Sequence, residues 1–162
     1  MSSTNIVTLR AEEQRLEAWV NFLRAHAAIT RELSARLQRE HGLTLNDYEV
    51  LLHLARSEHG MMRRVDLAAS VLLTASGITR LLDGLEQCGY VEKASCAADA
   101  RVSYAKVTDA GRAKLAEASD GHLADIEELF TGIYSPSERA TLAELLSRLP
   151  MTGDDCRSAC TA

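Results

Sequence analysis

The segment from Thr74 to Gly89, TASGITRLLDGLEQCG, combines one apolar stripe with an opposite face of small polar groups. The stripe follows the i, i+3, i+4, i+7 spacing of one helix face, with Ile78, Leu81, Leu82 and Leu85. Thr74 is a suitable N-cap, and Gly89 suits the position just past a helix end. The pattern therefore predicts a helix with one buried face and one exposed polar face.

The exposed face of this helix carries Ser76, Thr79 and a single long cation, Arg80. A helix that enters a DNA major groove needs little bulk, hydrogen-bonding groups for base edges and a guanidinium that can pair with guanine. An ordinary solvated surface helix has a similar composition. The neighbouring segments therefore decide between the two interpretations.

Those neighbours predict a winged helix-turn-helix. A short helix at residues 65–70 and a tight turn precede the Thr74–Gly89 helix. After Gly89 the periodicity changes to two, which predicts strands at residues 90–93 and 102–107 joined by a polar loop at 94–101. A hairpin at this position is a wing, and Arg101 at its tip is placed to reach the minor groove or the phosphates.

Helical patterns occupy both ends of the chain. Residues 9–39 contain no Pro or Gly, and a helix of this length in a small protein commonly packs on a partner. A capping box at Thr44 opens the next helix at residues 45–57, in which Tyr48, Leu51, Leu52 and Ala55 are expected to be buried. Thr108 caps a helix that runs to about residue 133, and Ser135 caps the last helix. We therefore expect a mainly α fold with one small β-hairpin.

The net charge of −5 argues mildly against nucleic acid as a partner, but the charge is unevenly distributed. Residues 61–114 hold 8 Lys and Arg against 6 Asp and Glu, whereas residues 115–162 hold 3 against 9. Phosphate contacts depend on local cations rather than on the sum over the chain. The acidic total therefore leaves a DNA-binding face possible on the central segment.

The sequence has four cysteines: Cys88, Cys96, Cys156 and Cys160. Structural disulfides are not expected because export signals are lacking, and a zinc site is not expected because paired Cys spacings are lacking. Free thiols are one interpretation, and a redox switch at Cys88 or Cys96 is the other. The five histidines do not form a ligand pattern. We expect no metal, no cofactor and no enzymatic activity. No apolar run reaches the length of a membrane span, so we expect a cytoplasmic protein.

Two stretches resemble the MarR family of bacterial transcriptional regulators: VDLAASVLLTASGITRLLDGLEQCGYVEK, like its helix-turn-helix, and DARVSYAKVTDAG, like its wing. The resemblance covers about residues 10–149. It implies a homodimer that reads a palindromic operator in double-stranded DNA, and often a repressor released by small aromatic acids or by oxidation. Gly84 and Ala100 depart from the family pattern, since both positions often hold arginine in relatives.

Together with what the resemblance implies, these patterns divide the chain into four parts: an N-terminal dimerisation helix at residues 1–43, a winged helix-turn-helix DNA-binding domain at 44–108, C-terminal dimerisation helices at 109–150 and a disordered tail at 151–162. Arg80 is the predicted base reader, and Ser76 and Thr79 either contact DNA or only cap the helix. Four more cations are candidates for phosphate contacts: Arg63, Arg64, Lys93 and Lys106.

Arg15 and Trp19 lie four residues apart, so one helix face offers a guanidinium to a carboxylate and an indole to an aromatic ring. This pair is the predicted site for an aromatic acid effector. In the alternative, Trp19 packs in the dimer interface and Arg15 is solvated. Two function classes remain: a dimeric, ligand-responsive repressor, with a redox-sensing regulator as its subtype, and a winged helix used as a protein-interaction module.

Overall fold

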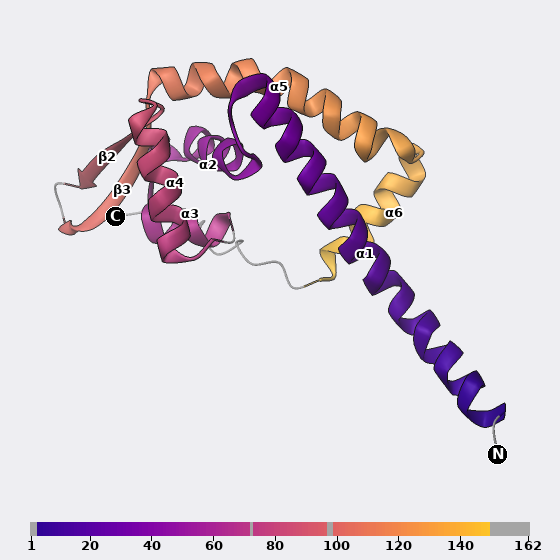
Figure 1. Cartoon of the computed structure of the whole chain (residues 1–162). Helices are drawn as coiled ribbons and strands as arrows, with labels where there is room; N and C mark the ends of the chain where they lie inside the picture. The colour runs from indigo at the N-terminus through magenta and orange to yellow at the C-terminus, as the bar shows by residue number, and fades with distance from the viewer. Residues whose placement is uncertain (1–2, 72, 97–98, 150–162) are drawn as a thin grey trace.

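The computed structural model describes residues 3–71, 73–96 and 99–149, and for residues 3–15, 95, 96 and 99–101 it describes the main chain only. The expected mainly helical fold with one small antiparallel sheet is confirmed (Figure 1). In chain order the elements are α1 (Ser3–His41), α2 (Leu45–Arg56), η1 (Glu58–Gly60), β1 (Met61–Arg63), α3 (Arg64–Ser70), α4 (Ala75–Gln87), β2 (Val91–Cys96), β3 (Asp99–Val107), α5 (Asp109–Leu129), η2 (Thr131–Ile133) and α6 (Pro136–Ser147). The tail from residue 151 lies outside the described residues.

Side-chain caps start the helices where the sequence places them. Thr44 and Asp47 form a capping box at α2, and Ser135 and Glu138 form another at α6. The Thr108 hydroxyl accepts a hydrogen bond from the Gly111 amide at the start of α5. Each cap satisfies a main-chain donor that the first turn of a helix leaves unpaired. Local chemistry therefore determines these boundaries.

The sheet contains one strand more than the predicted hairpin. Its order is β1-β3-β2, with Met61 opposite Lys106 and Val91 opposite Val107. The predicted loop at residues 94–101 is wrong at both ends, because β2 continues to Cys96 and β3 begins at Asp99. Pairing continues because main-chain hydrogen bonds need no apolar side chains, and a register shift between Ser95 and Cys96 accommodates the irregularity.

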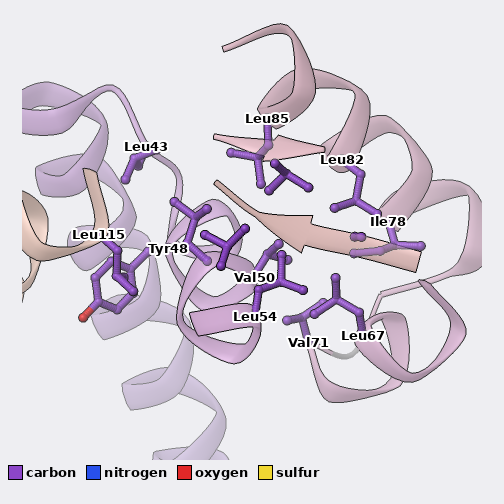
Figure 2. Close-up of a cluster of buried hydrophobic side chains, with 14 of the residues drawn as sticks. Leu43, Tyr48, Val50, Leu54, Leu67, Val71, Ile78, Leu82, Leu85 and Leu115 are labelled. Carbon is purple, nitrogen blue, oxygen red and sulfur yellow. The ribbon is translucent and has the colours of Figure 1, made fainter. Parts of the chain in front are cut away.

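The core lies where α2, α3, α4 and the sheet meet (Figure 2). Leu54, Leu67 and Leu82 are fully buried there. The expectation that Leu52 and Ala55 are buried is only partly met, since both are partly buried while Val50 and Leu54 lie fully inside. Val50 and Leu54 are enclosed although they lie beside the predicted stripe, because several elements pack against α2.

The long helix α1 joins the core only through its C-terminal half. Leu33 and Leu37 are buried, and Arg36 Nη1 lies 2.7 Å from Asp125 Oδ1 of α5. Arg36 also binds Glu128 of α5, and this hydrogen bond lowers the pKa of that carboxyl group. The N-terminal half of α1 extends away from the rest of the molecule (Figure 1).

Within the part of the chain that the structure describes, no single helix has the length and apolar character needed to cross a membrane. The sharply bent pair α3 and α4 meets that measure only when the two helices are counted together.

Candidate nucleic-acid interface

The predicted helix-turn-helix is formed by α3 and α4, whose axes differ in direction by 104°. Ile78, Leu82 and Leu85 anchor α4, and each is at most 3 % exposed. Figure 2 shows these three side chains directed from α4 into the buried cluster that also holds Leu67 and Val71. Because the buried stripe fixes the rotation of α4 about its axis, the opposite polar face is directed toward solvent.

Short hydroxyl side chains line the first turns of α4. The Thr74 hydroxyl accepts from the Gly77 amide at 3.1 Å and lies 3.2 Å from the hydroxyl of Ser76. Thr79 donates to the carbonyl oxygen of Ala75 at 2.8 Å. Ser76 and Thr79 are both exposed, so each hydroxyl oxygen remains accessible to a base edge or a phosphate.

Arg80 projects from the same face of α4. Its side chain is exposed and makes no ion pair within the described part of the chain. A guanidinium needs both properties to form a paired contact with guanine. The geometry is therefore compatible with the predicted role of Arg80 as base reader.

The other predicted DNA-binding cations with described side chains all face carboxylates. Arg63 Nε lies 2.6 Å from Asp66 Oδ2, and Lys106 Nζ lies 2.9 Å from Glu92 Oε1. Arg64 and Lys93 both contact Glu86. The phosphate contacts of these cations stay predictions. To bind a phosphate, each cation must either leave its carboxylate partner or bind both groups at once.

The wing is held close to the end of α4. Gly89 adopts a left-handed φ of 73°, and its carbonyl oxygen accepts a 2.7 Å hydrogen bond from the Thr108 hydroxyl. The Thr108 amide in turn donates to the Tyr90 carbonyl oxygen at 3.1 Å. These bonds join both strands of the wing to the C-terminus of α4. The side chains of Asp99 and Arg101 lie outside the described residues.

Of the predicted effector-binding pair, Arg15 and Trp19, only Trp19 has a described side chain. Trp19 is 57 % exposed on α1, and its ring lies 6.3 Å from that of Phe22, whereas the Arg15 side chain is outside the described residues. A separate hollow of about 260 Å³ lies between α1 and the start of α2. It is lined by Thr30, Arg31, Ser34, Thr44, Leu45 and Asn46.

The redox candidates are likewise partly described. Cys88, the C-cap of α4, is an exposed free thiol, whereas the Cys96 side chain lies outside the described residues, as do Cys156 and Cys160. Among the residues with described side chains, no group of His, Cys, Asp and Glu has the arrangement of a metal site.

Sequence patterns did not single out Glu86, which contacts cations from two other elements. They also did not identify the contact of His122 with Tyr48, although the helical stripe of α5 included His122. Both relationships join residues far apart in the chain, and no local spacing signals them.

An anchored α4 with an exposed guanidinium, preceded by α3 and followed by a hairpin, defines a winged helix-turn-helix DNA-binding domain. The sequence model of the MarR family matches residues 41–102. The chain is 29 % identical over 147 residues to the uncharacterized HTH-type transcriptional regulator YkoM of Bacillus subtilis, with 88 % of this chain and 93 % of YkoM covered.

Another relative is the HTH-type transcriptional repressor YetL of Bacillus subtilis, 28 % identical over 108 residues, with 67 % of this chain and 64 % of YetL covered. The structure of Sco3205, a MarR family regulator from Streptomyces coelicolor in complex with DNA, superposes with a TM-score of 0.79 at 28 % identity and covers 85 % of both chains. By these similarities the chain resembles the MarR family, and they support a DNA-binding transcriptional regulator.

Proposed function

We propose that the protein is a homodimeric repressor that binds a palindromic operator and releases it when a small aromatic or phenolic acid binds. The observation that carries its DNA-reading part is the exposed polar face of α4, on which Arg80 stands without an acidic partner among the described residues. Ser76 and Thr79 flank Arg80 on that face. In this proposal Arg80 reads a base, and Arg101 of the wing contacts the adjacent groove.

Exposed apolar side chains on α1 support the homodimer. Five large apolar residues of this helix are at least 36 % exposed in the single chain: Leu16, Trp19, Val20, Phe22 and Leu23. Leu145 and Leu149 near α6 are also about half exposed. A contiguous apolar face of this kind marks an interaction surface, because water solvates it poorly. In the proposal a second copy of the chain covers this face, and the dimer presents two copies of α4 to one duplex.

The proposal assigns a role to each part of the chain. In this proposal residues 44–108 bind DNA, and residues 1–43 and 109–150 form the dimer. The match of the family model to residues 41–102 supports the first assignment. The name of YetL, a repressor, favours repression over activation.

The DNA-binding proposal is tested by selecting binding sites from a random duplex library and measuring affinity for the selected site against salt concentration. We expect an inverted repeat and a steep loss of affinity, with log K falling by about 0.9 per phosphate contact for each tenfold increase in salt. If no site is enriched and affinity does not depend on salt, the winged helix serves as a protein-interaction module instead.

For the effector, the proposal places the carboxylate of an aromatic acid on Arg15 and its ring on Trp19. The control is Arg31, the guanidinium that lines the hollow between α1 and α2. We expect Arg15→Ala to keep operator affinity and to abolish release by a panel of aromatic acids, while Arg31→Ala keeps both. If only Arg31→Ala abolishes release, the effector binds in the hollow.

Oxidation is the alternative signal, and the exposed thiol of Cys88 favours testing it. In a redox-sensing regulator, oxidant lowers operator affinity, and Cys88→Ser or Cys96→Ser removes the effect. Unchanged binding of the wild type after oxidation excludes this subtype.

A further inference from the structure

The carboxylate of Glu86 joins three parts of the DNA-binding domain. Glu86 lies near the end of α4, and its Oε1 atom accepts from Arg64 Nη2 at 2.7 Å. Arg64 is the first residue of α3. The other oxygen, Oε2, lies 3.2 Å from Nζ of Lys93, which belongs to the wing strand β2. One acidic group therefore connects the two helices of the reading motif to the wing.

The two contacts of Glu86 differ in their exposure. The Arg64 and Glu86 side chains are only 17 % and 19 % exposed, whereas Lys93 is 65 % exposed. Arg64 Nε is buried and has no hydrogen-bond partner among the described residues. Within those residues, Glu86 is the acidic group that pairs with this guanidinium. Breaking such an enclosed pair leaves a poorly solvated charge, and the contact between α3 and α4 is therefore strongly held.

Glu86 does not share the reading face with Arg80. The two residues are six positions apart, which separates their side chains by about 120° around a helix. Glu86 consequently acts on DNA recognition only through the orientation of α4 and through the cations that it binds. Released from Glu86, both Arg64 and Lys93 become available to phosphates, which carry no sequence information.

We propose that Glu86 is a specificity-determining positioning residue: it fixes α4 against α3 and the wing, and it withholds Arg64 and Lys93 from phosphates of any sequence. This inference rests on the proposed DNA-reading function. It explains why two predicted phosphate-binding cations contact Glu86, whereas Arg80 makes no ion pair within the described part of the chain.

The test compares the affinities of wild type and Glu86→Gln for the selected operator and for a random duplex, each across a salt series. We expect the random-duplex affinity to rise and the ratio of operator to random affinity to fall about tenfold or more. The salt slope on random duplex should steepen by about one to two phosphate contacts. A purely structural role would not change this slope.

Glu92→Gln is the matched control. It removes one negative charge on the wing and releases Lys106, yet within the described residues Glu92 makes no ion pair with α3 or α4. We expect it to raise both affinities by a similar factor and to leave their ratio within about threefold of the wild type. This outcome would show that the effect of Glu86→Gln comes from the contacts that Glu86 makes and not merely from the loss of one negative charge.

Lys93→Met in the wild-type background provides a second measurement, which does not depend on the folding of the Glu86 variant, and Lys93 can be replaced safely because it is largely exposed. In the wild-type background we expect no change of the salt slope on random duplex, whereas in the Glu86→Gln background Lys93→Met lowers the slope by about one. A slope lowered by one in the wild-type background overturns the proposal, since Lys93 then binds phosphate already.

An unchanged ratio and slope in Glu86→Gln also overturns this inference while leaving the proposed function intact. If the wild type itself selects no operator and shows no salt dependence, the proposed function fails and this inference fails with it.

Discussion

The imidazole ring of His122 lies against the phenol ring of Tyr48, with ring centroids 4.4 Å apart and planes inclined by 56°. His122 belongs to α5 and Tyr48 to α2, so this contact joins the proposed dimerisation helices to the DNA-binding domain. His122 is 4 % exposed, and its Nδ1 atom has no hydrogen-bond partner among the described residues.

Burial lowers the pKa of His122 from its usual value, although Asp125 opposes the shift. The unfolded chain therefore takes up a proton at this residue more readily than the folded chain does. We expect the free energy of unfolding to fall as the pH drops from 7.5 to 5.5, and His122→Phe to reduce that fall. Urea unfolding at the two pH values measures it.

A matched control for this prediction is His53→Gln, which changes a histidine outside the α2–α5 contact and should retain the fall. Carboxyl groups act in a separate pH range. Lys114 and His41 lower the pKa of Glu117, so its contribution is lost only as the pH falls below about 4.5. An equal fall in wild type and His122→Phe between pH 7.5 and 5.5 would contradict the assignment to His122.

Arg80→Ala should weaken operator binding by about 1 to 3 kcal/mol and relax the sequence preference at one base step in each half-site. The reason is that the Arg80 guanidinium is exposed and makes no ion pair among the described residues, so it can pair fully with guanine. Competition binding with operators varied at single positions measures the effect. An unchanged preference at every position would exclude Arg80 as a base reader, whereas uniform weakening would assign it to phosphate.

Two glycines should respond in opposite directions to alanine. At Gly84 a Cβ atom meets open space on exposed α4, so Gly84→Ala should stabilise the protein by about 0.5 to 1 kcal/mol. At Gly111 a Cβ atom would overlap the Tyr90 carbonyl oxygen, so Gly111→Ala should destabilise by about 1 to 3 kcal/mol. Denaturant unfolding measures both changes, and equal effects would contradict the described packing.

Trp19→Asp should dissociate the proposed homodimer, because a carboxylate on an apolar interface loses its hydration. We expect sedimentation to show a monomer at concentrations where the wild type is dimeric. Operator affinity should fall about 100-fold or more, since the two half-sites are then bound independently. Asn21→Asp introduces the same charge on the opposite side of α1 and should remain dimeric. Dissociation by both variants would mean that charge on α1, not the apolar face, decides assembly.

The helices could be predicted from the sequence because their signals are local. Thr44, Thr74, Thr108 and Ser135 each cap a helix through a main-chain amide three residues later, so spacing alone reveals them. The apolar stripe of α4 likewise predicted which face is buried, and therefore that Arg80 is exposed.

The tertiary structure decided which residues from distant segments of the chain contact one another. β1 joins β3 across more than forty residues, Arg36 pairs with Asp125 across 89, and Arg64 pairs with Glu86 across 22. A charged residue has the same sequence signature whether it faces solvent or a carboxylate, because pairing depends on how helices pack. The sequence by itself thus determined the helices and the exposed polar face of α4, whereas only the packing decided that Arg64 and Lys93 meet Glu86 while Arg80 makes no ion pair with any described residue.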